Sequence, residues 1–265
     1  ELQFIVDDSG ASVLCADARH WETATALRDR CPSIRQLVGM DGGPSPDGAP
    51  TWDELASHDP APVPRSLDAD CVAGITYTGG TTGLPKGVMQ THGNLVVNAK
   101  HMLWGNPLFE SDRFLHLSPM FHSAGVANMY ALTLVAGTHV TCPGFDADLV
   151  GHMIEQHRIT VAVLVPTMLN MFLNHAGTAE RDLSSWRMCL YAASPMPVSL
   201  LERAMSELPC GFSQGYGMTE MCPHVSQLSK EDHELAASGD PDAVRRLASA
   251  GTPCIGVDVE VRRDD

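Results

Sequence analysis

The sequence predicts an α/β fold made of layered, largely parallel sheets with flanking helices. Short apolar runs rich in Val, Ile, Leu and Thr alternate along the chain with segments of helical periodicity. Several of these runs are almost continuously apolar, which is typical of strands covered by helices on both faces. Ligands of such sheets bind beyond the carboxyl ends of the strands, so residues that directly follow strands are the first candidates for chemistry.

The strand candidates are rich in β-branched residues, and the helix candidates lie between them. The strands are expected at residues 2–6, 34–39, 71–77, 113–117, 138–142, 160–165, 187–192 and 257–261. The helices are expected at residues 20–30, 94–103, 123–136, 147–157, 167–175 and 198–208. Asp146 is placed to cap the helix at 147–157, and Pro197 is placed at the first position of the last helix.

Two stretches interrupt this alternation. Residues 41–65 are loaded with Gly, Pro and Asp, and we expect an exposed loop with one short helical turn near residues 52–56. Residues 228–250 are charged and polar, with a helix-prone piece at 242–249, and we expect a surface excursion.

Composition limits the class of protein. Of 265 residues, 44% are hydrophobic, which is enough for a sizeable core, and no apolar run approaches the ~20 residues of a membrane span. The chain has 17 basic and 32 acidic residues, a net charge of −15, and so acidic a surface repels nucleic acid and anionic lipid. We expect no nucleic-acid partner and no transmembrane segment.

The eight cysteines are scattered and form no C-x-x-C pair, which disfavours a zinc site. The even count leaves a disulfide set open, but several cysteines lie in apolar, strand-like runs. Free thiols in a reducing compartment are therefore the better interpretation, and we expect a cytoplasmic protein.

The strongest local feature is the segment Thr78–Lys86, which reads T-G-G-T-T-G-L-P-K and directly follows a predicted strand. Its glycines expose backbone N–H groups, its threonines add hydroxyl donors, and its lysine adds a fixed charge, a set that suits a polyphosphate. The residues are Thr78, Gly79, Gly80, Thr81, Thr82, Gly83 and Lys86. The segment is not a Walker A loop, because a strand-like run follows Lys86 where that motif continues into a helix. A ligand-free β-hairpin is the alternative for the segment taken alone.

Several motifs together resemble those of the acyl-adenylate-forming enzymes, which include acyl-CoA synthetases, peptide-synthetase adenylation domains and luciferases. They occur in the family's order through most of the chain. The matching segments are 75–88 (I-T-Y-T-G-G-T-T-G-L-P-K-G-V), 91–95 (T-H-G-N-L), 119–122 (P-M-F-H), 191–197 (Y-A-A-S-P-M-P), 214–220 (Q-G-Y-G-M-T-E) and 251–253 (G-T-P).

The resemblance implies that Thr78–Lys86 hold the β- and γ-phosphates of ATP while an acyl carboxylate attacks the α-phosphate. Negative charge gathers where two anions meet, so clustered donors are needed there. The family usually has Ser where this chain has Gly79, which removes one hydroxyl and keeps the backbone donor.

The resemblance implies further roles for the residues that follow two other strands. Ala192, Ala193, Ser194 and Pro195 would line the adenine pocket, although the family often has Gly in place of Ala192. In the segment Gly215, Tyr216, Gly217, Met218, Thr219 and Glu220, the tyrosine would lie against adenine, the threonine would contact the α-phosphate and the glutamate would bind Mg²⁺. A turn with a solvent-facing carboxylate is the alternative for that segment.

His122 resembles the family residue that borders the acyl carboxylate. The small residues that follow it in the sequence would leave room for an acyl group, and close helix packing explains them equally well. ATP, Mg²⁺ and coenzyme A are the implied cofactors and substrates, with a carboxylic acid, most often a fatty acid in this family, as the group activated.

Other functions remain open at this point. Residues 211–215 match G-x-S-x-G, so Ser213 is a candidate esterase nucleophile. Transfer of the acyl group to a carrier protein competes with transfer to coenzyme A, although the P-M-F-H and G-Y-G-M-T-E motifs resemble acyl-CoA synthetases. Residues 1–265 are expected to be a partial N-terminal AMP-binding domain without the family's C-terminal lid, so the isolated chain is expected to bind nucleotide without completing catalysis.

Overall fold

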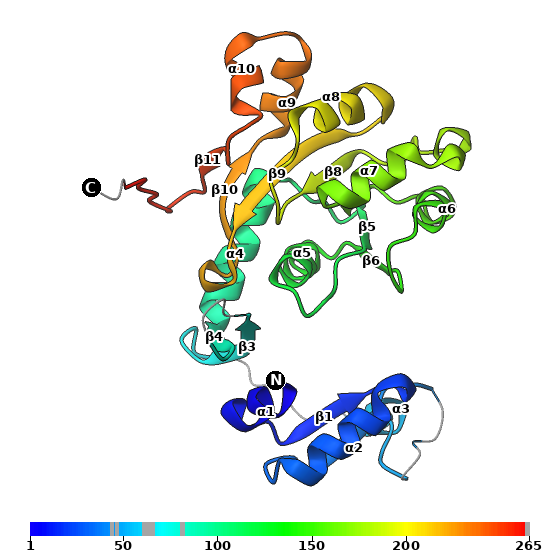
Figure 1. The fold of residues 1–265 in the computed structure, drawn as a ribbon, viewed down its shortest axis with the longest axis vertical. Helices are drawn as coiled ribbons and strands as arrows, with labels where there is room; N and C mark the ends of the chain where they lie inside the picture. The colour runs from blue at the N-terminus through cyan, green and yellow to red at the C-terminus, as the bar shows by residue number, and fades with distance from the viewer. Residues whose placement is uncertain (43–44, 46–47, 60–66, 80–82, 263–265) are drawn as a thin grey trace. The chain divides into compact units, whose positions relative to one another are not determined.

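The computed structural model describes residues 1–42, 45, 48–59, 67–79 and 83–262. The chain forms two compact units, residues 1–89 and 90–265, which are considered separately. Figure 1 labels their elements.

The first unit begins with helix α1 (Leu2–Ser9), which ends at Gly10 in a left-handed conformation with φ of 65°. A parallel pair of strands follows, β1 (Val13–Ala16) and β2 (Gln36–Gly39). Between them lie the 3₁₀ turn η1 (Ala18–His20) and helix α2 (Trp21–Arg30). The unit ends with helix α3 (Trp52–Ala56) and a two-stranded sheet of β3 (Val72–Thr78) and β4 (Lys86–Thr91).

The second unit is organised around a seven-stranded sheet in the order β11-β10-β9-β8-β7-β5-β6. The strands from β5 to β9 run parallel, whereas β10 is antiparallel to β9 and β11 to β10. Their bounds are β5 Arg113–His116, β6 Thr138–Thr141, β7 Val161–Val163, β8 Met188–Tyr191, β9 Gly211–Gly217, β10 His224–Leu228 and β11 Thr252–Pro253.

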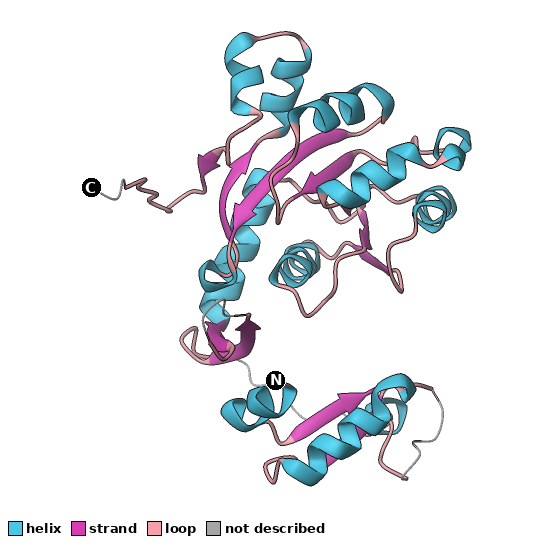
Figure 2. Cartoon of the chain, viewed as in Figure 1, coloured by secondary structure: helices cyan, strands magenta, loops and turns pink. Residues whose placement is uncertain are grey.

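Helices cover both faces of this sheet (Figure 2). Alternate residues of the strands belong to different cores, as the period of two requires. Phe114, Val161 and Leu190 pack in one cluster with residues of α4 (His92–Gly105) and α5 (Ser123–Leu134). Leu115, Ala162 and Cys189 pack in another with α6 (Ala147–His157), α7 (Pro166–Asn174) and α8 (Val198–Glu207).

The remaining short elements are the 3₁₀ turns η2 (Ala176–Glu180) and η3 (Thr219–Met221) and the helices α9 (Lys230–Ala237) and α10 (Pro241–Arg246). Among the described residues, every helix is too short or too polar to cross a bilayer.

The α/β class and the mainly parallel sheet confirm the prediction from the sequence, and helix α6 has the predicted bounds with Asp146 capping it through Leu149 N–H. Pro197 lies one position earlier than expected, at the N-cap of α8. Two predicted strands are wrong. Residues 2–6 form helix α1, because the apolar run continues into a turn that Gly10 can end. Residues 257–261 have no regular structure and Val261 is 92% exposed, since no strand among the described residues pairs with them.

The two irregular stretches differ in outcome. In residues 41–65, the short helical turn is α3, and residues 43–44, 46–47 and 60–65 lie outside the described part of the chain. Residues 228–250, expected as a surface excursion, contain α9 and α10, and their apolar side chains Ala236, Ala243 and Leu247 are buried in the larger core. The few hydrophobic residues spaced along this polar segment pack into the larger core and hold the segment against it.

Candidate functional site

The segment predicted to grip phosphate lies in the first unit, between β3 and β4. Thr78 ends β3, Lys86 begins β4, and the Thr78 hydroxyl donates to the Lys86 carbonyl oxygen at 3.5 Å. Gly87 is needed for this pairing, because a Cβ there would lie 2.8 Å from the side chain of Ile75. Gly79 and Gly83 are described, whereas Gly80, Thr81 and Thr82 lie outside the described residues.

The other predicted site residues lie in the second unit: His122 at the N-cap of α5, and the rest at or just after the carboxyl ends of β8 and β9, two adjacent parallel strands with Tyr191 opposite Gln214. Ala192 to Pro195 follow β8, and Gly215 to Gly217 end β9. Two cavities open at this edge, and they share Ala193 and the three residues Gly215, Tyr216 and Gly217 as a common wall.

The outer cavity has a volume of about 470 Å³. Two of its walls are the chain segments predicted to hold adenine, and a third is the end of α10 with the loop after it. It is lined by Ala193, Ser194, Pro195, Met196, Gln214, Gly215, Tyr216, Gly217, Leu247, Ala248, Ser249 and Ala250. Most of these present backbone or small side chains, which leaves a slot beside the half-exposed ring of Tyr216.

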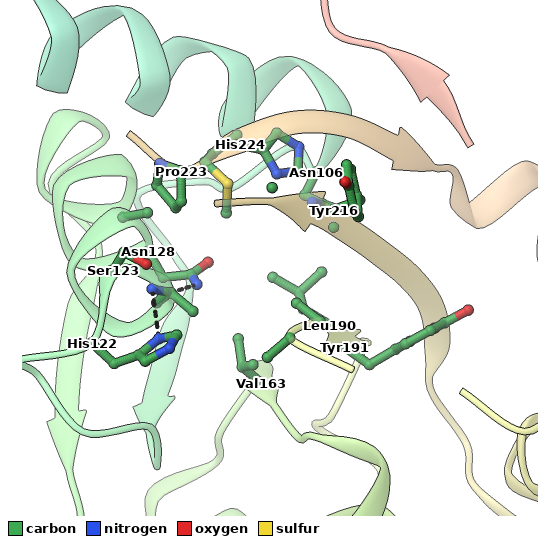
Figure 3. Close-up of a pocket in the computed structure, with 17 residues that line it drawn as sticks. Asn106, His122, Ser123, Asn128, Val163, Leu190, Tyr191, Tyr216, Pro223 and His224 are labelled. Atoms are coloured by element: carbon green, nitrogen blue, oxygen red, sulfur yellow. Dashed lines mark hydrogen bonds between the residues drawn. The ribbon is translucent and has the colours of Figure 1, made fainter. Parts of the chain in front are cut away.

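The inner cavity has a volume of about 80 Å³ (Figure 3). It lies between the carboxyl ends of β7, β8 and β9 and the helices α4 and α5. Its walls are mainly apolar, with a few polar side chains among them. It is lined by Met102, Asn106, His122, Ser123, Ala124, Ala127, Asn128, Val163, Leu190, Tyr191, Ala192, Ala193, Gly215, Tyr216, Gly217, Pro223 and His224.

His122 is fixed on the wall of the inner cavity as the N-cap of α5. Its Nδ1 accepts a hydrogen bond from the Ala124 backbone N–H at 3.2 Å. The neutral ring then carries its proton on Nε2, which leaves a donor for a ligand. Small residues follow in α5, and Gly125 is buried where a Cβ would lie 2.6 Å from the Pro119 carbonyl oxygen.

Thr219 and Glu220 follow β9 in the turn η3. The Thr219 hydroxyl donates to the Ser123 hydroxyl at 3.2 Å, so the threonine is held against the first turn of α5. Glu220 is exposed, and Met218 is 49% exposed. Thr219, Glu220 and Met218 line neither cavity, in contrast to Gly215, Tyr216 and Gly217.

Ser213 is not available as a nucleophile. It is fully buried in β9, donates to the Leu228 carbonyl oxygen at 2.9 Å and accepts from Gln227 Nε2 at 2.7 Å. The G-x-S-x-G match is therefore not a nucleophile elbow, which requires an exposed hydroxyl. The serine-hydrolase alternative is wrong because this hydroxyl joins β9 to β10 inside the sheet.

The same hydrogen-bond chain continues to His224 on the wall of the inner cavity. Gln227 Oε1 lies 3.1 Å from His224 Nε2, and burial lowers the pKa of this histidine below its usual value. Since Gln227 Oε1 can only accept, the neutral ring carries its proton on Nε2 and leaves Nδ1 as an acceptor. Gly105 lets this arrangement form, because a Cβ there would collide with the Gln227 amide.

A second buried pair supports the strand that leads to the site. The Tyr191 hydroxyl and His233 Nε2 are 2.8 Å apart, and His233 Nδ1 lies 2.6 Å from the Ser229 carbonyl oxygen. Burial raises the pKa of Tyr191 and lowers that of His233, so both groups are neutral.

The backbone is strained two residues after Tyr191, in the wall that both cavities share. Ala193 has a φ of 73°, which is a costly conformation for a residue with a Cβ.

Sequence reasoning missed Asn106, Asn128 and His224, and it missed residues 247–250 as a wall of the outer cavity. These residues come from four separate segments with no common motif. The one signal available was the amide side chain of Asn128 within the mostly apolar segment 124–132.

Comparison with known proteins identifies the class of this fold. It is the fold of the N-terminal domain of acyl-adenylate-forming enzymes. The model of the AMP-binding enzyme family matches residues 1–265, and the chain belongs to this family. The expected family is confirmed.

Similar proteins include acyl-CoA ligases. The chain is 34% identical to a feruloyl-CoA synthase of an Amycolatopsis species, over 98% of this chain and 48% of that protein. It is also 34% identical to the medium/long-chain-fatty-acid–CoA ligase FadD8 of Mycobacterium tuberculosis, over 92% of this chain and 44% of that protein. The structure of the O-succinylbenzoate coenzyme A synthetase MenE from Bacillus subtilis, in complex with ATP and magnesium ion, matches with a TM-score of 0.78 and 28% identity, over 99% of this chain and 48% of that one. The chain spans about half the length of these relatives.

Proposed function

We propose that the protein activates a carboxylic acid with ATP, forming acyl-AMP and pyrophosphate, and then transfers the acyl group to coenzyme A. The observation that carries this proposal is the pair of cavities separated by Gly215–Gly217. A roomy cavity beside an aromatic ring suits adenine, and a smaller apolar one suits an acyl group. The acyl phosphate anhydride would form where the two cavities meet.

The residues of the outer cavity fit a nucleotide. Glycine is required at Gly217, because a Cβ there would overlap the Pro223 carbonyl oxygen, and the backbone stays open to a flat ligand. We assign adenine to Tyr216 and to Ala192–Pro195, and the β- and γ-phosphates to Thr78, Gly79, Gly80, Thr81, Thr82, Gly83 and Lys86. In the activation step, a carboxylate oxygen bonds to the α-phosphorus while the bond to the bridging oxygen breaks and pyrophosphate leaves.

His122 and Thr219 are assigned to the reacting groups. The Nε2–H of His122, whose Nδ1 accepts from Ala124 N–H, would orient the carboxylate, and the hydroxyl of Thr219 would turn from Ser123 to donate to the α-phosphate. Glu220 would bind Mg²⁺, which would neutralise phosphate charge. Among the described residues, no three His, Cys, Asp or Glu side chains lie close enough to hold a metal. A single carboxylate completed by phosphate oxygens and water is how Mg²⁺ is commonly held beside nucleotides.

Coenzyme A is favoured over a carrier protein as the acceptor. The names of the similar proteins specify CoA ligases, and the chain carries His122 and Thr219 in the motifs P-M-F-H and G-Y-G-M-T-E. The names cover both fatty and aromatic acids, so a fatty acid, which the sequence favoured, is one candidate class among the acids. A cytoplasmic location stays a prediction from the cysteine pattern.

ATP–pyrophosphate exchange by the full-length protein tests the activation step. We expect exchange that depends on a carboxylic acid, measured over a panel of aliphatic and aromatic acids, and thioester formation when coenzyme A is added. Acid-dependent exchange without any CoA thioester, but with loading of a carrier protein, would replace the second half of the proposal. Absence of exchange with every acid of the panel would contradict the first half.

A further inference from the structure

The last residue of β8 is bonded to a helix that does not line the outer cavity. The Tyr191 side chain points away from the inner cavity, as Figure 3 shows, and its hydroxyl lies 2.8 Å from Nε2 of His233 in α9. The two rings meet edge to face, with an angle of 87° between their planes. Tyr191 is completely buried and His233 is 2% exposed, so water cannot replace either group as a partner.

The direction of this hydrogen bond is fixed by the far side of the histidine ring. His233 Nδ1 lies 2.6 Å from the Ser229 carbonyl oxygen, which can only accept. Nδ1 therefore carries the proton of the neutral ring, and Nε2 accepts from the Tyr191 hydroxyl. Burial keeps the ring neutral by lowering its pKa. Removal of either side chain's polar group would leave the other buried without its partner.

The turn of α9 that carries His233 is itself fixed in place. Ser229 and Asp232 form a capping box, in which the Asp232 N–H donates to Ser229 Oγ at 3.1 Å. Asp232 Oδ1 accepts from Arg246 Nε at 2.8 Å. Arg246 ends α10 and directly precedes the wall of the outer cavity at 247–250. One turn of α9 is therefore bonded to residues next to two walls of the same cavity.

The backbone that follows Tyr191 has a conformation that needs support. Ala193 has a positive φ of 73°, and a strained residue of this kind persists only where its surroundings over-determine it. Ala192 and Ala193 have no side chain that can form a hydrogen bond. The hydroxyl of Tyr191 is therefore the side-chain bond that fixes the start of this turn, which belongs to the segment assigned to adenine.

We propose that His233 is a positioning residue for the nucleotide, which acts through the Tyr191 hydroxyl to hold the turn at Ala193 in the shape that accepts adenine. This inference rests on the proposed function, because it assumes that ATP occupies the outer cavity. His233 itself does not line that cavity. It raises the fraction of the protein in which the turn is ready to bind, and the apparent affinity for a ligand scales with that fraction. The bond should therefore affect ATP binding more than the reaction of bound ATP.

The first test measures ATP binding by the full-length protein. Y191F removes one oxygen atom from the pair, and H233L removes the acceptor. We expect isothermal titration calorimetry with ATP alone to give a Kd about five- to twentyfold higher in each variant than in the wild type. In ATP–pyrophosphate exchange, KM for ATP should rise by a similar factor while kcat stays within about threefold. Either variant alone decides the outcome, so the test does not need both to fold.

T178V provides a matched control for the loss of a buried hydroxyl. Thr178 is 8% exposed, its Oγ1 donates to the Phe172 carbonyl oxygen at 2.7 Å, and it lines neither cavity. We expect T178V and Y191F both to unfold at lower urea concentration than the wild type, and only Y191F to raise the Kd for ATP. An equal rise in Kd in T178V would overturn the inference, because reduced stability alone would then explain the weaker binding.

The double variant Y191F/H233L tests whether the two residues act through one bond. Its Kd for ATP should lie within about twofold of that of the weaker single variant, because both changes remove the same hydrogen bond. Increases in Kd that multiply in the double variant, or a wild-type Kd in either single variant, would overturn the inference and leave the proposed function standing. If the wild-type protein neither binds ATP nor supports exchange with any acid, the proposed function and this inference are both wrong.

Discussion

The two cavities that meet at the end of β9 are built in different ways. The outer cavity is formed by three continuous segments, 193–196, 214–217 and 247–250, and presents mostly backbone and small side chains. The inner cavity shares residues 215–217 and also includes 122–124 and 190–193, but the rest of its lining consists of dispersed residues of α4, α5, β7 and the start of β10, spread between Met102 and His224. A ligand common to a whole family can be held by contiguous backbone, whereas a ligand particular to one protein is recognised by dispersed side chains. Substitutions that affect the outer cavity, the inner cavity or both test whether the two cavities hold different ligands.

The largest effect is expected where the two ligands react. E220Q keeps the size of the side chain and removes the charge assigned to Mg²⁺ binding, so we expect acid-dependent ATP–pyrophosphate exchange by the full-length enzyme to fall about 10²–10³-fold. E202Q changes another exposed glutamate, in α8, and should leave exchange within about twofold of wild type. Exchange at wild-type rate in E220Q would remove this residue from the site.

Filling the inner cavity should impair acid use alone. Ala127 is 6% exposed and lines this cavity and not the outer one, so the larger side chain of A127L would occupy much of the ~80 Å³ available. We expect kcat/KM for the best acid to fall about 10–100-fold while KM for ATP stays within about twofold, as measured by exchange at saturating partner substrate. A parallel rise in KM for ATP would show that the cavities do not act separately.

Obstructing the outer cavity should have the reverse and smaller effect. Ala248 is an exposed residue of its third wall, so A248W should raise KM for ATP about tenfold with little change in KM for the acid. A237W places the same side chain on an exposed position of α9 that lines neither cavity and should leave both constants unchanged. If A248W and A237W behave alike, the outer cavity is not where nucleotide binds.

The smallest effect on catalysis is expected from substitution of Ser213, which lies in β9 two residues before the wall that both cavities share. S213A leaves Gln227 Nε2 without its acceptor, so we expect the free energy of unfolding to fall by about 1–3 kcal/mol with exchange activity changed only a few-fold. Urea denaturation measures the free energy of unfolding, and the ATP–pyrophosphate exchange assay measures the activity. S206A, an exposed serine of α8, should be within about 0.5 kcal/mol of wild type. Labelling of Ser213 by a fluorophosphonate in the native protein would reinstate it as a nucleophile.

The sequence predicted the parts of the molecule whose physical requirements are local. Parallel strands buried on both faces are recognisable as apolar runs, and Asp146 and the short helix α3 follow from capping chemistry within four residues. The segments 192–195 and 215–217, most of whose residues line the outer cavity, were predicted because they directly follow or end strands and resemble motifs of a known family.

Other parts could not be predicted because they depend on distant partners. Residues 257–261 have a strand-like sequence and no pairing strand among the described residues, and the fate of a strand depends on its neighbour. His224 is a cavity wall with a defined tautomer only because Gln227, three residues away, is fixed by Ser213 of the adjacent strand. Asn106 and Asn128 acquire a common cavity only when α4 and α5 pack together.

Helices α9 and α10 form from a polar stretch of sequence, yet they support the outer cavity. His233 of α9 contacts the tyrosine of β8 that precedes the shared wall, and the residues after α10 complete the outer cavity. The exposed turn at Ser238–Asp240 between these helices looks like a convenient place to insert an affinity tag, a fluorescent label or a protease site. Such an insertion would lie only a few residues from the wall of the outer cavity at 247–250, so it would disturb that cavity rather than act as a neutral handle.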